Sequence, residues 1–374
     1  MKRLTALLLA LTLALALTAC GGKTPDPAPA APPAAEPAGT PAAPETDPAP
    51  ETPDDAVTYP LTLTDMAGRT VTIPSEPQKI VSGYYISSSA CVALGLKARM
   101  VGVEDKSDKR PIYKLAAPEL IDKVNVGSAK AFDLEACVAA EPDLVILPQQ
   151  RRDTADTLAE MGVPALVVVP ESHEQILEMF ALIGQAANVK AAAQALSSYY
   201  TGKLEAVEAM TQGIAQDARP VVYMAGTSGY LRTSPKDMYQ SSLISAAGGV
   251  NAGDGIEGSN WVDISYEQLL SMDPEVIVIP TNNFATSAPD YTAADVLADP
   301  QLSGVRAVKS GAVYEMPTGF EAWDSPAPSG ILGTLWMLKT LHPEVYSGEQ
   351  FASDVGEFYE TFYGFTPDTA SLSK

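Results

Sequence analysis

The sequence is short of the residues on which most enzyme and metal sites depend. It has three cysteines and two histidines among 374 residues, and His173 and His342 both read as surface helix ends. It contains no HExxH, Walker A, CxxC or GxSxG pattern. Imidazole is the commonest ligand of zinc and similar ions, so capture of free zinc or manganese is disfavoured, as is a histidine-ligated haem, although tyrosine could serve. We expect no enzymatic activity, no metal site and no cofactor.

Positive charge is also scarce. The chain has 24 Lys and Arg against 46 Asp and Glu, which gives a formal net charge of -22. A protein this acidic is a poor partner for nucleic acid, which binds basic surfaces. An acidic surface suits solubility, and it also suits docking onto basic loops of a membrane protein.

The longest apolar run, Leu4–Leu17, is too short for a comfortable membrane span. It follows the basic pair Lys2 and Arg3 and ends in LTAC at Cys20, a pattern that resembles a bacterial lipobox. That resemblance implies removal of residues 1–19 as a signal peptide and acylation of Cys20. An ordinary secretory signal with an incidental cysteine is the alternative.

Residues 20–57 predict a disordered tether behind that cysteine. Eleven of the 31 prolines fall between positions 21 and 55, interleaved with Ala, Thr, Asp and Glu. Such a segment cannot bury a core and favours extended polyproline II conformations. At roughly 3.1 Å per residue it would reach on the order of 100 Å from a membrane.

The two remaining cysteines, Cys91 and Cys137, lie in apolar helical stretches. They are expected to be buried as small hydrophobic residues. A disulfide between them stays open, because the chain is predicted to be exported.

Two stretches of the chain, 132 positions apart, are similar to each other. Residues 133–148 read DLEACVAAEPDLVILP and residues 265–280 read SYEQLLSMDPEVIVIP. In both, a glutamate (Glu135, Glu267) opens a short helical run, an acidic-Pro pair ends it, and an apolar strand follows. One copy in each half indicates two lobes of one design with a cleft between them.

The folded part opens near Tyr59, where alternating apolar residues around a turn at 65–68 predict a β-hairpin. Strands then alternate with helices at about twenty-residue spacing, which predicts a parallel sheet in an α/β lobe. The expected elements are strand 80–81, helix 87–94, strand 100–103, a helix from 133, strand 144–148, helix 155–161 and strand 165–169.

From position 189 to 214 apolar residues recur at helical spacing without a strand signal, which predicts one long helix between the lobes. A second α/β series follows from Pro220 and ends in a helical tail. The expected division is a signal peptide (1–19), a tether (20–57), an N-terminal lobe (58–187), an interlobe helix (188–215) and a C-terminal lobe (216–374).

Several motifs, taken in order, resemble the helical-backbone (class III) periplasmic binding proteins of ABC importers. They are TDMAGRTVTIPSEPQKIV, the Glu-containing repeat before PDLVI, SSLISAAGGVN and WVDISYEQLL, and the resemblance runs from about residue 60 to the end. It implies two similar α/β lobes with parallel sheets, joined by a single long interlobe helix. It also implies a ferric siderophore, haem or cobalamin as cargo, and permease and ATPase subunits as partners.

The repeated glutamates can be interpreted in two ways, as helix-stabilising residues or as docking residues. A carboxylate in a first helical turn complements the helix dipole, which contributes about 0.3–1 kcal/mol, and Ser265 with Gln268 makes a plausible capping box. In the resembled family, one such glutamate on each lobe pairs with an arginine of the permease. The resemblance therefore implies that Glu135 and Glu267 dock the transporter.

Ligands of α/β proteins bind where strands end in loops, and here those loops carry aromatic and basic side chains. These would suit the organic frame and the anionic groups of a ferric chelate. The counterpart of Trp261 lines the ligand site in the family's cobalamin binders, whereas Ala129 replaces an aromatic residue often found in them. The candidate ligand-binding residues are Tyr84, Tyr85, Lys109, Arg110, Arg151, Arg232, Trp261 and Trp323.

We therefore expect a monomeric, lipid-anchored protein on the extracytoplasmic face of the bacterial cytoplasmic membrane. It would capture an anionic iron complex of the ferric siderophore type and deliver it to a permease. A corrinoid or haem cargo is the alternative within this class. An exported cleft enzyme and a structural or sensory lipoprotein are the alternatives outside it.

Overall fold

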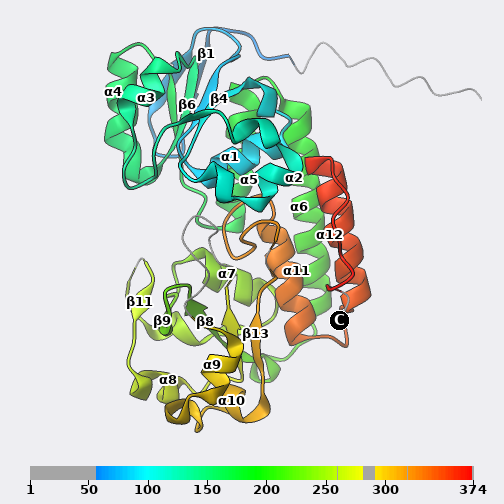
Figure 1. Ribbon diagram of the computed structural model, residues 1–374. Coiled ribbons are helices and arrows are strands. Elements are labelled where there is room, and N and C mark those ends of the chain that lie inside the picture. Colours follow the sequence, from blue (N-terminus) through cyan, green and yellow to red (C-terminus); the bar gives the residue numbers. More distant parts are fainter. Residues whose placement is uncertain (1–55, 259, 281–290, 318, 373–374) are drawn as a thin grey trace, which may run out of the picture. The chain divides into compact units, whose positions relative to one another are not determined.

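The computed structural model describes residues 56–258, 260–280, 291–317 and 319–372, shown in Figure 1. The predicted signal peptide, Cys20 and the tether up to residue 55 lie outside the described residues. Among the residues described, none of the helices has both the length and the apolar character that crossing a bilayer requires.

The first lobe is built on a five-stranded parallel sheet, as predicted. Its strands alternate side chains between two buried faces, so Ile80 and Val81 belong to different hydrophobic clusters. Helices α1 (Tyr85–Ala93) and α5 (His173–Ala186) cover one face, and α3 (Leu134–Ala139) and α4 (Arg152–Glu160) cover the other. The strand order is β5 (Val124–Asn125), β4 (Met100–Val103), β3 (Ile80–Ser82), β6 (Leu144–Pro148) and β7 (Ala165–Val168).

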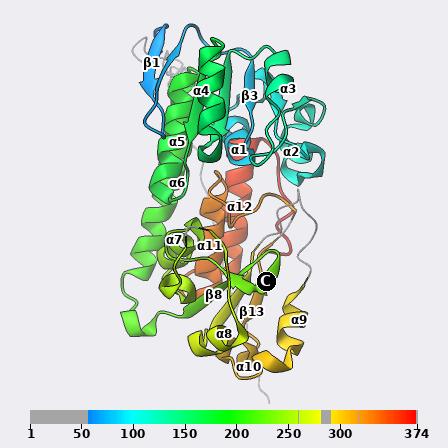
Figure 2. The same ribbon diagram turned by 90° about the vertical axis from the view of Figure 1, so that its left-hand side faces the viewer.

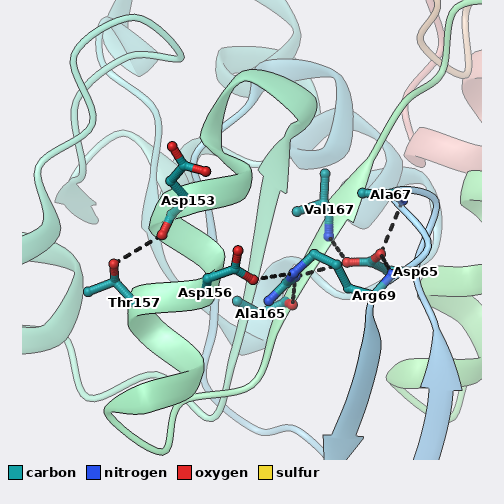
Figure 3. A network of polar contacts seen from close by, with 8 residues as sticks. All are labelled: Asp65, Ala67, Arg69, Asp153, Asp156, Thr157, Ala165 and Val167. Carbon is teal, nitrogen blue, oxygen red and sulfur yellow. Dashed lines mark hydrogen bonds and ion pairs between the residues drawn. The ribbon is translucent and has the colours of Figure 1, made fainter.

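The predicted hairpin is confirmed as β1 (Leu61–Thr64) paired with β2 (Thr70–Ile73) in antiparallel register. A polar network at its turn fastens it to the lobe (Figure 3). The buried carboxylate of Asp65 accepts hydrogen bonds from the Arg69 guanidinium at 2.9 Å and from the backbone amide of Val167 at 3.0 Å. Arg69 also contacts Asp156 on α4 at 2.7 Å.

The predicted interlobe helix is α6 (Lys190–Thr211), and it runs beside both lobes (Figures 1 and 2). Its residues Leu196, Tyr200 and Val207 are buried at the predicted spacing. Two C-terminal helices, α11 (Gly330–Leu341) and α12 (Gly348–Tyr363), share its hydrophobic cluster. Because this cluster includes strands of both sheets, the lobes are braced along one continuous core.

The second lobe differs from the prediction of a wholly parallel sheet. β8 pairs in parallel with β12 and β10, but β8 and β9 form an antiparallel hairpin through a two-residue turn, and β11 pairs antiparallel with β9. A turn this short can join only antiparallel strands. The strands are β8 (Val221–Gly226), β9 (Gly229–Thr233), β10 (Val250–Asn251), β11 (Val262–Asp263), β12 (Val276–Ile279) and β13 (Val313–Glu315).

Short helices complete both lobes. The second lobe contains α7 (Tyr239–Ala246), α8 (Tyr266–Met272), α9 (Ala293–Ala298) and α10 (Arg306–Ser310), and the first adds α2 (Pro111–Ala116). The sequence interpretation did not include α2, α5, α9 or α10. It was also wrong to place His342 on the surface, because this side chain is 5% exposed at the end of α11.

Candidate functional site

Two adjoining cavities lie between the loops of the two lobes. The first cavity, of about 20 Å³, lies between the first lobe and the segment before α11, and the second, of about 190 Å³, adjoins it at Tyr85 and Ala322. The first is lined by Tyr85, Ser89, Arg110, Ile112, Tyr113, Phe320, Glu321, Ala322 and Ala327. The second is lined by Tyr84, Tyr85, Ile86, Glu171, Thr227, Met238, Tyr239, Gln240, Trp261, Ala322, Asp324, Ser325 and Pro326.

The β3–α1 loop places two aromatic side chains at the cavities. Ser82 and Ser87 hold the loop, because their hydroxyls lie 2.7 Å apart and each donates to the carbonyl of Tyr84. The rings of Tyr84 and Tyr85 pack edge to face, and the Tyr85 hydroxyl donates to Ser325 across the cleft at 2.8 Å. Burial raises the pKa of Tyr85 to about 12, so this hydroxyl stays protonated and available as a donor.

Arg110 is the predicted cation that reaches the first cavity. Its guanidinium lies 4.5 Å from the centre of the Tyr85 ring and forms an ion pair with Glu104 at 2.8 Å. Both side chains are almost fully buried, at 9% and 4% exposure. Glu104 is held further by the hydroxyls of Tyr113 at 2.8 Å and Ser88 at 2.6 Å. The charge of Arg110 is therefore already matched within the protein.

The opposite wall is the segment from Phe320 to Pro326. Trp323, a predicted ligand residue, is fully buried rather than facing a cavity, and its indole nitrogen donates to Tyr359 at 2.9 Å. It stacks on Phe320, which does line the first cavity. A Cβ at Gly333 would lie 2.1 Å from the Trp323 carbonyl oxygen, so glycine is required where α11 meets this segment.

Trp261 lines the second cavity, and Arg232 holds its backbone. The Arg232 guanidinium donates to the Trp261 carbonyl at 3.1 Å and lies 3.4 Å from the Asp263 carboxylate. Arg232 itself is not among the residues that line either cavity. Its place in the structure suggests support for the tryptophan rather than direct contact with a ligand.

The other two predicted cations lie away from both cavities. Lys109 is exposed and pairs with its neighbour Asp108 at 2.7 Å, and Arg151 donates to the Ala129 carbonyl at 2.7 Å. The structure thus does not gather the four predicted cations into one basic cleft. Among the described lining residues, carboxyl groups outnumber cations, with Glu171, Glu321 and Asp324 against Arg110.

Among the residues near the cavities that were not predicted individually are Glu104, Gln240 and Asp324. Gln240 donates through its amide nitrogen to the Asp324 carbonyl at 2.9 Å, which ties α7 to the opposite wall. Burial raises the pKa of the Asp324 carboxyl to about 7. Glu104 follows strand β4 directly, which is the one sequence signal that could have identified it.

Glu135 and Glu267 lie on exposed first turns of α3 and α8, as their repeat positions predicted. The predicted capping box of Ser265 and Gln268 is confirmed, and a hydrogen bond to Ser265 lowers the pKa of the Glu267 carboxyl. In the first lobe Asp133 caps α3 by accepting from the Ala136 amide at 2.9 Å. Each helix therefore has a capping residue other than its glutamate, and both glutamates are exposed.

The two described cysteines are buried in different hydrophobic clusters and carry free thiols, so no disulfide joins them. Burial raises the pKa of both Cys91 and Cys137 to about 12, which suppresses thiolate chemistry. Within the described ranges, no group of three or more His, Cys, Asp or Glu side chains could hold a metal ion.

Comparisons with known proteins agree with this architecture. Residues 80–318 match the family described as periplasmic binding protein. The molybdate-binding protein MolA of Haemophilus influenzae is 24% identical over 343 residues, which cover 83% of this chain and 93% of that protein. The solved structure of MolA bound to molybdate has a TM-score of 0.71 at 21% identity and covers 82% of this chain and 99% of that one.

Two further relatives are named for the binding of other ligands. A cobalamin-binding protein of Halobacterium salinarum is 29% identical over 228 residues, which are 60% of each protein. The Fe(3+) dicitrate-binding periplasmic protein FecB of Escherichia coli is 24% identical over 225 residues, which are 59% of this chain and 72% of that protein.

Proposed function

Because this chain belongs to the periplasmic binding protein family, we propose that it captures a metal complex with an organic frame in the cleft between its lobes. The observation that carries this proposal is the pair of aromatic walls. Tyr84 and Tyr85 face the cavities from the first lobe, and Trp261 and Phe320 face them from the other side. Aromatic side chains on both walls suit a large, partly apolar ligand.

The charge of the cleft favours a cargo without net negative charge. Arg110 is paired with Glu104, while Glu321 and Asp324 bring buried carboxyl groups to the cavities. A polyanion would meet these carboxylates without a free guanidinium to offset them. We therefore place a neutral or cationic ferric chelate, such as a ferric trihydroxamate siderophore, ahead of ferric citrate, molybdate and haem with its two carboxylates.

A corrinoid is the second candidate. Trp261 lines the second cavity, and the cobalamin-binding relative of Halobacterium salinarum is 29% identical. The many amide groups on a corrin ring would donate hydrogen bonds to the carboxyl and carbonyl acceptors of this cleft.

The second part of the proposed function is delivery of the cargo to a permease. Relatives of this chain are substrate-binding components of ABC transporters, and we propose that Glu135 and Glu267 contact the permease, one from each lobe. Both side chains are exposed and lie on helices away from the cavity-lining residues. We further propose that Cys20 anchors the chain as a lipoprotein through the tether 20–57, with lobes at 58–187 and 216–374 joined at 188–215.

Absorption spectroscopy of captured ligand tests the cargo. The purified protein would be mixed with a ferric trihydroxamate, ferric citrate, haemin, cyanocobalamin or molybdate and passed through a desalting column. Coelution of the trihydroxamate or cyanocobalamin spectrum in a 1:1 ratio is expected. Coelution of ferric citrate or haemin alone, or of molybdate by metal analysis, would contradict the charge argument.

A further inference from the structure

The second cavity contains an amide oxygen that no donor of the described chain satisfies. The Gln240 side chain is 7% exposed, and its nitrogen donates to the Asp324 carbonyl at 2.9 Å. A flipped amide would place oxygen against oxygen, so this bond fixes the orientation. The remaining Oε1 atom is buried at the cavity without a hydrogen-bond partner.

Asp324 adds a second acceptor of the same kind. Its side chain is 6% exposed, it lines the second cavity, and its Oδ1 atom has no hydrogen-bond partner in the described chain. A buried acceptor left unpaired costs about 1–3 kcal/mol, so a ligand that brings donors to both atoms regains this free energy on binding. The ligand group that fits here must donate hydrogen bonds.

The surroundings favour a donor with positive charge. Glu171 stands at the same cavity, and the rings of Tyr84, Tyr85 and Trp261 line it. No Lys, Arg or His is among the described residues that line this cavity. Carboxylates combined with aromatic faces are the surroundings in which an organic ammonium is bound best.

We propose that the second cavity is a subsite for an ammonium group of the cargo, held by Asp324 and Gln240 and enclosed by the aromatic rings. The inference rests on the proposed function, because this subsite is part of the same ligand-binding cleft. It goes further by stating that the cargo carries a protonated amine.

A fragment experiment tests the subsite without requiring the whole cargo. Butylammonium and 1-butanol have the same shape, and saturation-transfer NMR would compare their binding to the full chain. We expect a signal for butylammonium at least threefold stronger than for butanol. Asp324→Asn should remove most of this preference, and Gln240→Met, which keeps the side-chain size, should reduce it. The exposed control Asp122→Asn makes the same chemical change elsewhere and should leave it unchanged.

A matched pair of chelates separates this inference from the proposed function. A ferric trihydroxamate with one free primary amine should bind at least tenfold more tightly than the same chelate with that amine acetylated. Equal binding of both forms, with no butylammonium preference, would overturn the subsite and leave the cargo class intact. An Asp324-dependent butylammonium signal without binding of either chelate would keep the subsite and overturn the ferric-chelate assignment. Loss of both signals would overturn both.

Discussion

The carboxyl group of Asp324 is held in the folded protein at an energetic cost. Burial raises its pKa from 3.8 to about 7, so ionisation favours the unfolded chain, where the carboxylate is in water. The penalty is absent below the unfolded pKa, grows as pH rises toward 7, and is complete above it. Strongly shifted groups of this kind occur often in functional sites, which agrees with a role in ligand binding.

Replacing this carboxyl should therefore stabilise the free protein in a pH-dependent way. We expect Asp324→Asn to raise the free energy of unfolding by up to about 4 kcal/mol at pH 8 and by little at pH 4. Tyr85 and Tyr239, which face the carboxyl, remain neutral across this range, because burial raises the pKa of Tyr85 to about 12 and raises the pKa of Tyr239 well above its usual value. Denaturant titrations at the two pH values measure the difference, and an equal effect at both would contradict the burial argument.

The sequence pointed to the aromatic and basic residues around the cavities better than to their carboxyl and amide neighbours. Tyr85, Arg110 and Trp261, which line the cavities, were predicted because aromatic and basic residues at strand ends are visible as a pattern. That pattern cannot show that Arg110 is already paired, because Glu104 becomes its partner only through tertiary packing. The unpaired acceptor of Gln240 has no sequence signal, since it depends on a contact 84 positions away.

At the scale of elements, the hairpin β1–β2 depends on one buried carboxylate (Figure 3). Asp65 is fully buried and accepts from the Arg69 side chain and from three backbone amides, whereas Asp156 contacts the same arginine with 57% of its side chain exposed. Breaking a buried ion pair costs about 3–5 kcal/mol, and an exposed one contributes about 0–1 kcal/mol.

The two aspartates therefore make a matched pair of variants. Asp65→Ala should lower the free energy of unfolding by about 3–5 kcal/mol, and Asp156→Ala by less than about 1 kcal/mol. Ligand affinity should stay unchanged in both, since neither residue lines a cavity. Urea titrations give the stabilities, and similar losses in the two variants would show that the network is not centred on Asp65.

The elements themselves were largely predictable from sequence. Strands β4 and β6 have the predicted bounds, because a short apolar run between polar residues is a strong local signal. The antiparallel β8–β9 pair was missed, because strand direction is set by the turn between the strands rather than by their apolar content. Helices α2, α9 and α10 have five or six residues, too few to show a helical period.

Variants in the first turns of α3 and α8 test whether Glu135 and Glu267 contact the permease. Glu135→Ala and Glu267→Ala should leave ligand affinity within about twofold, because neither residue lines a cavity. Uptake should fall in each and further in the double variant, since a charge-assisted contact commonly contributes about 1.5–3 kcal/mol. Transport assays at limiting protein concentration measure this. Slightly lower melting temperatures with normal uptake would instead indicate helix-dipole complementation alone.

At the scale of the whole molecule, we predict that Cys20 determines where the protein is found. Acylation of this residue would hold the chain on the membrane, since two acyl chains give stable anchoring where one is marginal. Cys20→Ser should therefore release the protein into the soluble extracytoplasmic fraction. Fractionation of cells that lack the transporter measures this, because the permease cannot then hold the variant on the membrane. Membrane retention of Cys20→Ser in such cells would rule out the lipid anchor.

Capture of a metal complex in the cleft between the lobes is tested most directly by calorimetric titration. The free protein is titrated with a ferric trihydroxamate and with cyanocobalamin. We expect one of them to bind with 1:1 stoichiometry. Trp261→Ala should weaken that binding more than tenfold, which is about 1.4 kcal/mol, because it removes an aromatic wall of the second cavity. Arg232→Ala, which only loosens the Trp261 backbone, should weaken it less. Tight binding that is unaffected by Trp261→Ala, or tight binding of molybdate alone, would contradict capture of a metal complex in this cleft.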